Sequence, residues 1–337
     1  MGVVILHGFF CPYLLYQPGA DAETLSLMVR NVMLWAVPCF VMVTGALLLN
    51  PERELTISHI MNKYVKRALL ALILFTFVFA VFDEVTALHA GFVVMLKNFA
   101  VNLFTNHSWL HMWYLYMLIG IYLMMPAFRA VTADVDDQTL RYIILVLFLF
   151  QTCIPTINFF LKDTALGFYI PVYTVYPLYL FLGYAIHTGK IRMNMKSALS
   201  MAVCATIGIL AVTYVGVQDG NTQLIQMSSS YAFILVVFQA VGMFGLLKET
   251  EKKEEKGVNK LLAQVDRCSF GIYLMHVLFL YLFYRVGQVN PFVSGAGIKM
   301  LGISLLAFLG AWGSTWLLKH VPWIKDIIRI LSGFRFF

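Results

Sequence analysis

The amino-acid sequence predicts an all-α fold, a polytopic membrane protein built as a bundle of about ten transmembrane helices. Hydrophobic residues make up 61% of the 337 residues and charged residues only 12%. The hydrophobic residues are gathered in blocks close to the roughly 20 residues that a helix needs to cross the hydrocarbon core. Because lipid offers no hydrogen bonds to free backbone groups, each block is expected to form a helix.

The expected spans follow one another with polar gaps between them. They cover residues 1–16, 31–50, 66–83, 113–131, 141–160, 171–188, 197–217, 229–247, 268–286 and 297–318. The first span would be ~24 Å long as a helix, short of a hydrocarbon core ~30 Å thick, so we expect the chain to lack the start of its first helix. The segment 84–112 is too apolar for a free loop, and we expect it to fold back against the bundle.

The basic residues predict the orientation of the bundle. Of the 24 Lys and Arg residues, 19 lie in the even-numbered gaps or after the last span, and 5 lie in the odd-numbered gaps. Lys and Arg accumulate on the cytoplasmic side, so both termini are expected to be cytoplasmic. The net charge of +7 is then a topology signal and requires no nucleic-acid partner. We expect one membrane domain over 1–320 and a cytoplasmic amphipathic tail over 321–337.

The cysteines and common catalytic motifs exclude several classes of chemistry. None of the five cysteines forms a C-x-x-C pair, and most lie in apolar blocks where small buried thiols are ordinary. We therefore expect neither disulfides nor a metal site. The sequence also has no H-E-x-x-H, no nucleophile elbow and no glycine-rich phosphate loop.

Histidines inside the spans are the first candidates for chemistry. His7 lies in the first span, and polar side chains at membrane depth are functional candidates by default. A neutral imidazole suits general-base catalysis near pH 7, and the alternative is a hydrogen bond in helix packing. His111 stands directly before Trp113 and Tyr114, which favours either an interfacial aromatic belt or a side chain facing a water-filled cavity. Tyr273 and His276 are three residues apart, so they share a helix face and could meet one ligand or each other.

A basic cluster occupies the cytoplasmic mouth of the third span. Lys63, Lys66 and Arg67 fall at positions i, i+3 and i+4, which places them on one face of a helix. Such a cluster can bind phosphates, with Arg offering a bidentate fork and Lys a point charge. The alternative is membrane anchoring under the positive-inside rule.

Four sequence blocks resemble those of one known family. Residues 37–45, 111–126, 176–184 and 269–276 are similar, in order, to blocks of the acyltransferase-3 family of integral-membrane O-acyltransferases. With the ten-span layout, the resemblance covers nearly the whole chain. It looks closest to the short bacterial members of the family.

The resemblance implies transfer of an acyl group, most often acetyl, from cytosolic acyl-CoA to a hydroxyl of a cell-envelope glycan or sugar-lipid. It implies a multi-pass protein of the bacterial plasma (inner) membrane, with acyl-CoA as co-substrate and no tightly bound cofactor. His7 matches the family's first-span His and would be the base, with His111 and His276 as alternatives. The residues that would contact coenzyme A are Lys63, Lys66 and Arg67. The candidates for contacts with the substrate or the oxyanion are Trp113, Tyr114, Tyr273 and His276.

Two departures from the family pattern leave alternatives open. The family's first-span Arg, which precedes the His by eleven positions, would fall before Met1, and Thr44 replaces the usual Ser before Gly45. A non-catalytic member of the family is therefore one alternative. A transporter or lipid-linked sugar flippase without acyl-transfer chemistry is the other, because ten spans fit it equally well.

Overall fold

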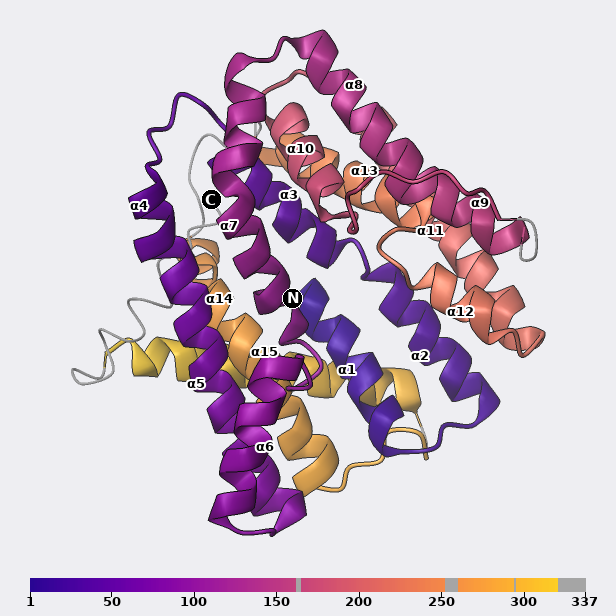
Figure 1. Ribbon diagram of the computed structural model, residues 1–337. Coiled ribbons are helices and arrows are strands. Elements are labelled where there is room, and N and C mark those ends of the chain that lie inside the picture. The colour runs from indigo at the N-terminus through magenta and orange to yellow at the C-terminus, as the bar shows by residue number, and fades with distance from the viewer. Residues whose placement is uncertain (162–164, 252–259, 294, 321–337) are drawn as a thin grey trace.

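The computed structural model describes residues 1–161, 165–251, 260–293 and 295–320, and all regular secondary structure in them is helical (Figure 1). The helices are α1 (Gly2–Leu15), α2 (Ala20–Val32), α3 (Ala36–Leu48), α4 (Ile57–His59), α5 (Lys66–Asp83), α6 (Phe92–Thr105), α7 (Trp113–Asp134), α8 (Asp137–Phe148), α9 (Ile154–Leu161), α10 (Tyr176–His187), α11 (Met195–Gln218), α12 (Thr222–Ser228), α13 (Ile234–Glu251), α14 (Lys260–Tyr281) and α15 (Ala296–Leu318). Short π-helical segments extend or join several of them, at Ile60–Val65, Glu84–Leu88, Leu149–Cys153 and Leu282–Val286.

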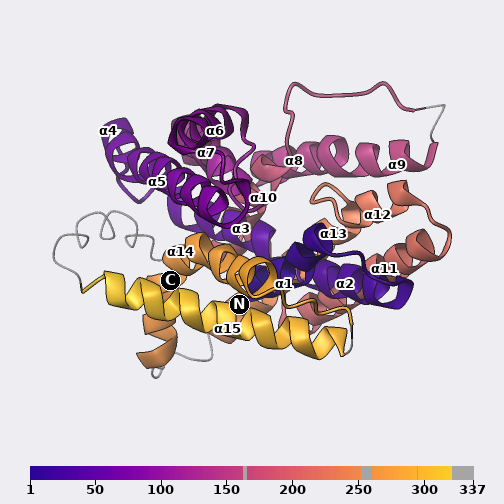
Figure 2. The same ribbon diagram turned by 90° about the horizontal axis from the view of Figure 1, so that it is seen from below.

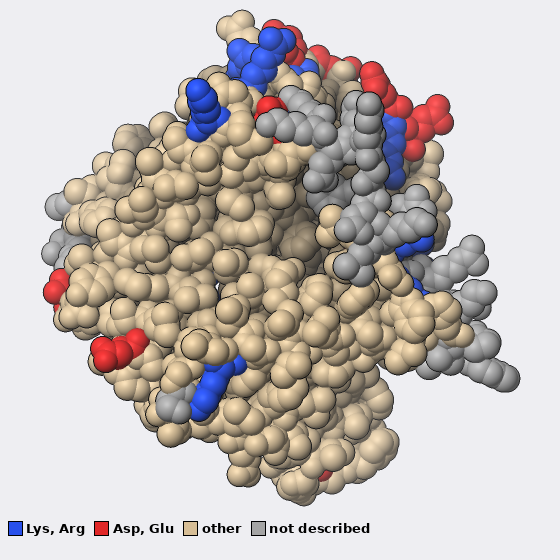
Figure 3. Space-filling view, turned by 180° about the vertical axis from the view of Figure 1, so that it is seen from behind, with Lys and Arg blue, Asp and Glu red and all other residues tan. Residues whose placement is uncertain are grey.

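The all-helical membrane fold is confirmed. In the described residues, seven helical segments are long and apolar enough to cross a membrane: Ala20–Leu48, Ile57–Leu88, Trp113–Asp134, Asp137–Leu161, Met195–Gln218, Leu262–Val286 and Ala296–Leu318. Charged side chains gather along one edge of the molecule and leave most of the visible face without charge (Figure 3). The cytoplasmic location of the termini stays a prediction, and the expected tail over 321–337 lies outside the described residues.

Four of the ten expected spans differ in the structure. The spans expected at 1–16 and 171–188 are the shorter helices α1, of 14 residues, and α10, of 12. The span expected at 229–247 begins later, because residues 229–233 are not helical and α13 starts at Ile234. The span expected at 31–50 begins already at Ala20, because α2 is helical despite its charged residues. The charged residues of α2 hide it from a reading of hydropathy alone. Hydrogen bonds from α2 to other helices, such as those of Asn31, stabilise it in the structure.

The segment 84–112 folds back against the bundle, as expected. Helix α6 lies beside α5 (Figures 1 and 2), and the rings of Phe77 and Phe99 pack edge to face with centroids 5.5 Å apart. Beyond α6, the indole of Trp109 stacks on Phe79 with a centroid distance of 4.1 Å and an interplanar angle of 4°. This return places the amino end of α7 against the inner face of α5.

Two helical segments break where they cross the interior. Residues 33–35 interrupt the path from α2 to α3, and residues 229–233 interrupt the path from α12 to α13. A break leaves backbone carbonyls without helical partners, and side chains from other helices take up these groups. Gln239 donates from Nε2 to the carbonyl oxygens of Asn31 and Val32, at 3.3 and 3.2 Å, and the Tyr179 hydroxyl donates to the carbonyl of Tyr231 at 2.7 Å.

A proline creates a similar requirement in α1. Pro12 has no N–H to bond the carbonyl of Gly8, four residues earlier. The Tyr284 hydroxyl donates to that carbonyl instead, at 2.9 Å. The interaction ties α1 to the end of α14, and α15 packs along α14 at one side of the molecule (Figure 2). Figure 1 shows the amino end of α1 near the centre of the molecule, surrounded by the other helices.

Helices α3 and α10 approach each other most closely at two glycines. A Cβ added at Gly45 would lie 1.9 Å from the carbonyl oxygen of Leu180, and one at Gly183 would lie 2.0 Å from that of Met42. Only glycine permits this backbone contact, which is a common way for helices to pack in membranes. The two glycines belong to the blocks 37–45 and 176–184 singled out in the sequence.

We expect Gly45→Ala and Gly183→Ala each to lower stability by about 1–3 kcal/mol, because the added methyl group would force the helices apart. The measurement is the midpoint of thermal unfolding of the purified protein in detergent. Gly120→Ala and Gly302→Ala are matched controls, since no heavy atom lies within 4 Å of the added Cβ in these two helices. A midpoint for Gly45→Ala equal to that of the controls would contradict the close packing.

Candidate functional site

A small cavity in the centre of the bundle brings together residues from distant parts of the chain. Its volume is about 20 Å³, room for roughly one water molecule. It is lined by side chains of α1, α3, α14, the start of α7 and the segment before α13, namely Val3, His7, Val37, Phe40, His111, Trp113, Tyr114, Tyr231 and Tyr273. Five of the residues singled out in the sequence therefore line one cavity, and His276 lies directly behind His7.

Three histidines form a cluster at this cavity. The ring centroids of His7 and His276 are 5.0 Å apart, those of His111 and His276 are 5.2 Å apart, and those of His7 and His111 are 6.1 Å apart. All three side chains are buried, with exposed fractions of 6% or less. The three candidate bases of the sequence are thus neighbours in space.

The hydrogen bonds determine which ring nitrogens of His276 and His7 carry protons. His276 Nδ1 lies 2.6 Å from the carbonyl of Tyr273 and 3.1 Å from that of Ile272, and carbonyls can only accept. Nδ1 of His276 therefore carries the proton, and its Nε2, 3.0 Å from His7 Nδ1, is the acceptor in a neutral ring. His7 Nδ1 is then the donor, which leaves the lone pair of His7 on Nε2. His276 thus orients His7 and holds it in the tautomer that a base requires.

His111 has the opposite tautomer. Its Nε2 lies 3.2 Å from the carbonyl of Leu274 and must donate, so the lone pair is on Nδ1. This Nδ1 is buried and has no hydrogen-bond partner among the described residues. The Tyr273 hydroxyl donates to the backbone carbonyl of His111 and so fastens the start of α7 to α14. Tyr273 is therefore a structural link whose hydroxyl is already engaged.

Tyr114 supplies an unused donor. Its hydroxyl is buried and lacks a partner among the described residues, and its ring packs edge to face on Tyr273 at 5.4 Å. Buried polar groups are nearly always hydrogen-bonded in native proteins, and the exceptions require an explanation. The free acceptor on His111 and the free donor on Tyr114 line the same cavity, which is the arrangement expected of a site that awaits a polar ligand.

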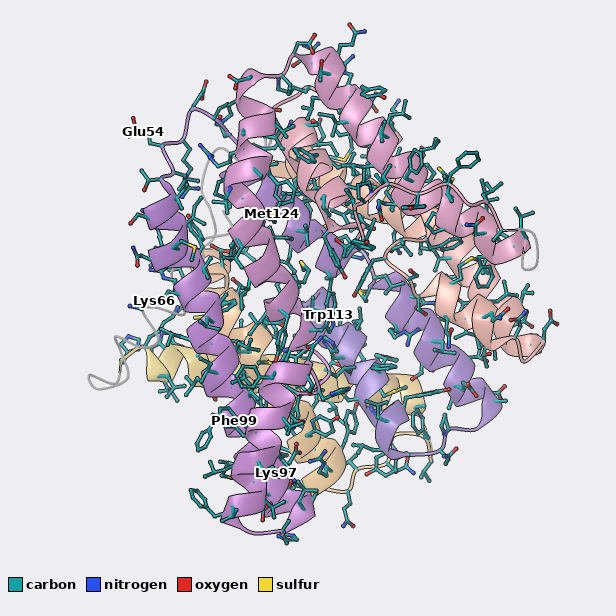
Figure 4. All side chains as sticks on the ribbon, viewed as in Figure 1. Glu54, Lys66, Lys97, Phe99, Trp113 and Met124 are labelled. Carbon is teal, nitrogen blue, oxygen red and sulfur yellow. The ribbon has the colours of Figure 1, made fainter. Side chains whose placement is uncertain are left out.

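Helix amino ends add to the field in this cavity. Helices α3, α7 and α13 begin at or next to residues that line it, and α10 begins at Tyr176, whose ring is 6.0 Å from that of Trp113. The amino end of a helix carries a partial positive charge of roughly half an elementary charge. Four such ends favour the development of negative charge near Trp113, which Figure 4 shows at the centre of the molecule.

An outer group of side chains supports His111. Asp83 accepts a hydrogen bond from Trp109 Nε1 at 2.8 Å and forms an ion pair with Arg285. Trp109 stacks on Phe79, and Phe79 contacts the edge of the His111 ring at 5.4 Å. The sequence provides no signal for this group, because its members lie in three separate segments: α5, the residues before α7, and the residues after α14.

The basic cluster lies apart from the cavity, toward the opposite end of α7. Lys63 lies over the Tyr64 ring at 5.6 Å, and Arg67 interacts electrostatically with Lys63, Tyr64 and Tyr122. Tyr122 follows Tyr114 by eight residues on α7, about 12 Å along the helix axis. A ligand bound at both places would therefore have to be long and thin.

Two further arginines join this cluster, and the sequence analysis missed them. Arg53 donates to the Tyr64 hydroxyl at 2.9 Å, and Arg129 donates to the carbonyl of Asn50 at 3.0 Å and to that of Arg53. Both were counted only as topology signals, because they are far apart in the sequence. Lys66 is exposed, and Figure 4 shows it at the outer edge of α5.

The described residues contain no group of three or more His, Cys, Asp or Glu side chains that could hold a metal ion. All five cysteines are free.

This cavity, lined by His7 and His111, lies inside a bundle of helices that are long and apolar enough to cross a membrane, which defines the class of a membrane-embedded helical protein. The family model described as "Acyltransferase domain" matches residues 1–319. The chain therefore belongs to the acyltransferase-3 family of membrane acyltransferases. No curated protein and no solved structure matches it.

The tautomers assigned to the histidine pair can be measured directly. We expect nitrogen-15 spectra of the histidine-labelled protein to show His7 and His276 protonated at Nδ1 and His111 protonated at Nε2, because each bond to a carbonyl determines the donor. Spectra of the His7→Gln, His111→Gln and His276→Gln variants would assign the signals. A His7 ring protonated at Nε2 in the wild type would contradict the pairing.

Proposed function

We propose that this protein transfers an acyl group, acetyl in the first place, from cytosolic acyl-CoA to a hydroxyl of a cell-envelope glycan or sugar-lipid. It would do so in the plasma membrane of a bacterium. The observation that carries the proposal is that one cavity is lined both by His7, which His276 orients, and by Tyr114, whose hydroxyl has no hydrogen-bond partner among the described residues. Such a cavity offers a proton acceptor and an oxyanion donor at one place.

In the proposed reaction, Nε2 of His7 takes the proton from the acceptor hydroxyl as its oxygen attacks the thioester carbonyl. The carbonyl oxygen becomes an oxyanion, and the Tyr114 hydroxyl donates a hydrogen bond to it. The tetrahedral intermediate then collapses, the carbon–sulfur bond breaks, and His7 returns the proton to the departing thiolate. General-base catalysis contributes roughly 10²–10⁴ in rate, and one oxyanion donor roughly 10²–10³.

His276 and Tyr273 have other roles in this scheme. The neutral ring of His276 donates its Nδ1 proton to a backbone carbonyl and accepts a hydrogen bond from His7 through Nε2. His276 is therefore a positioning residue. The Tyr273 hydroxyl is engaged by His111. Among Tyr114, Tyr273 and His276, Tyr114 is then the remaining oxyanion donor, and Nδ1 of His111 can accept a hydrogen bond from a second hydroxyl of the acceptor.

The basic cluster suits the phosphates of acyl-CoA. Arg53, Lys63, Arg67 and Arg129 gather at the end of the bundle that the positive-inside rule assigns to the cytoplasm. Coenzyme A is long and thin, with phosphates at one end and the thioester at the other. Bound along α7, it would place the thioester beside Tyr114.

A transporter or lipid-linked sugar flippase is the second candidate, and the two broken helical segments favour it. Breaks of this kind surround the substrate sites of many membrane transporters. Purified protein in liposomes distinguishes the two functions: acyl transfer from labelled acyl-CoA to a sugar acceptor identifies the enzyme, and movement of the acceptor without acylation identifies the transporter.

We expect His7→Ala to reduce acylation of the acceptor by roughly 10²–10⁴-fold while expression and membrane insertion persist. His7→Gln should be nearly as inactive, because an amide can form a hydrogen bond but cannot take a proton at neutral pH. The measurement is transfer of radiolabelled acetyl from acetyl-CoA. His187→Ala is a matched control on the exposed end of α10 and should remain active. If both His7 variants had activity near that of the wild type, His7 would not be the general base, and His111 would be the next candidate.

We expect Arg67→Ala to raise the KM for acyl-CoA roughly 10- to 100-fold, since a charge-assisted hydrogen bond contributes about 1.5–3 kcal/mol. The kcat and the KM for the acceptor should change little. Lys66→Ala is the control, because it removes the same charge one residue away from an exposed position. Equal KM values for the two variants would contradict a role of the cluster in binding acyl-CoA and would favour a role in membrane anchoring.

A further inference from the structure

Arg30 is a basic residue that the proposed reaction does not use. The sequence places it in a gap before the second expected span, whereas the structure places it within α2, inside the membrane-crossing segment Ala20–Leu48. An ionisable residue in such a segment is costly and usually marks a functional site with a specific partner. Arg30 is partly buried.

All the partners that Arg30 has in the described structure are neutral. The guanidinium donates to the hydroxyl of Ser229 and, from Nε at 3.3 Å, to Oδ1 of Asn31, and it lies over the Phe10 ring at 5.1 Å. Two of its five N–H donors are thereby engaged. Among the described residues no carboxylate lies within 4 Å of it, and the nearby Glu23 accepts from Tyr13 instead.

Another arginine shows the contrast. Arg285 is also partly buried, but it forms an ion pair with Asp83. Removing a charge from water costs several kcal/mol unless an opposite charge compensates. In the described structure Arg30 has no opposite charge beside it. A bound anion would supply that charge.

The residues around Arg30 are held in place by hydrogen bonds to one another. Asn31 is fully buried, and its Nδ2 donates to Thr213 at 2.8 Å and to Ser228 at 3.3 Å. The hydroxyl of Ser229 donates to Oδ1 of Asn31 at 3.1 Å. The break at residues 229–233 therefore meets the last turns of α2 at Arg30, and Ser229 and Asn31 both accept hydrogen bonds from its guanidinium.

Arg30 also interacts with residues close to the histidine cavity. It interacts electrostatically with Tyr231, which lines the cavity, and Phe10 follows His7 by three residues on the same face of α1. On the other side, Ser230 lines an open pocket of about 290 Å³ between α9 and α12. The segment 229–233 thus separates the cavity from a pocket of a size that can hold a sugar.

We propose that Arg30, with Ser229, forms an anion-binding subsite for the acceptor, and that the acceptor is an acidic sugar. The group recognised is a carboxylate or phosphate, which a guanidinium binds through two parallel hydrogen bonds. Its sources would be a uronic acid unit of a glycan or the phosphate of a lipid-linked sugar. The subsite lies on the side that the predicted orientation assigns to the outside, opposite the coenzyme A cluster. This inference rests on the proposed function for the identity of the ligand as the acceptor.

The test measures binding to the purified protein by thermal shift, in two arms. One arm compares methyl glucuronide with methyl glucoside, and the other compares a short polyprenyl phosphate with the matching polyprenol. We expect one anion to bind roughly 10- to 100-fold more tightly than its neutral counterpart and to lose this preference in Arg30→Gln. The arm that responds identifies the source of the anion, and equal binding in both arms would overturn the proposal.

Three further variants keep the test decisive. Arg141→Gln removes an exposed charge elsewhere and should keep the anion preference. If Arg30→Gln does not fold, Arg30→Lys and Ser229→Ala replace it, and both should weaken anion binding several-fold. Wild-type anion binding in these two variants would overturn the proposal.

The binding test is independent of acyl transfer. Anion binding through Arg30 without any acyl transfer would refute the proposed function and leave the subsite intact. Acyl transfer by Arg30→Gln at an unchanged KM for the acidic acceptor would refute the subsite alone.

Discussion

The constraint on which the structure depends is that polar groups inside an apolar bundle must find partners within the protein. Lipid cannot supply hydrogen bonds, so every interruption of a helix requires a side chain from elsewhere. Gln239 meets this requirement at the end of α2, Tyr179 at the start of α13, and Tyr284 at the carbonyl released by Pro12. These bonds tie four regions of the chain together and determine how the helices around the cavity are oriented.

The same constraint gives meaning to the groups that remain unsatisfied. Eight buried side-chain atoms lack a hydrogen-bond partner among the described residues, and of these only the donor on Tyr114 and the acceptor on His111 belong to residues that line the cavity. Because both line a cavity with His7, and because four helix amino ends converge there, the exceptions mark the place where a polar substrate is expected. The histidine pair also depends on hydrogen bonds inside the protein. Backbone carbonyls accept the Nδ1 proton of His276, so His276 Nε2 accepts from His7 Nδ1 and the free lone pair of His7 is on Nε2.

Charge is divided between two places that suit two substrates. Four basic side chains gather beside Tyr64 and Tyr122, where they are accessible from the end predicted to be cytoplasmic. Arg30 lies in α2 near the helix break at residues 229–233, and its hydrogen-bond partners are the neutral side chains of Asn31 and Ser229. This separation of basic groups is the basis of the two binding sites proposed above, one for acyl-CoA and one for the acceptor.

The sequence by itself determined the class of fold, because about ten apolar blocks and a strong bias in the basic residues permit few arrangements other than a helical membrane bundle. It also singled out His7, His111, Tyr114 and Tyr273, which line one cavity, but it did not single out Tyr231, which lines the same cavity. It misjudged where two helical segments begin: the segment expected from residue 31 starts at Ala20 in spite of the charged residues of α2, and the one expected from residue 229 starts at Ile234.

Only the tertiary structure decided how these residues act together. The proximity of His7 to His276, separated by 269 positions, is decided by the packing of α1 on α14, and no local pattern records it. The separation of Lys66 from Arg67, the recruitment of Arg53 and Arg129, and the unpaired guanidinium of Arg30 likewise depend on which helix faces meet. The physical reason is that apolarity is a property of single residues and survives in the sequence, whereas hydrogen-bond partners and charge compensation are properties of pairs brought together by folding.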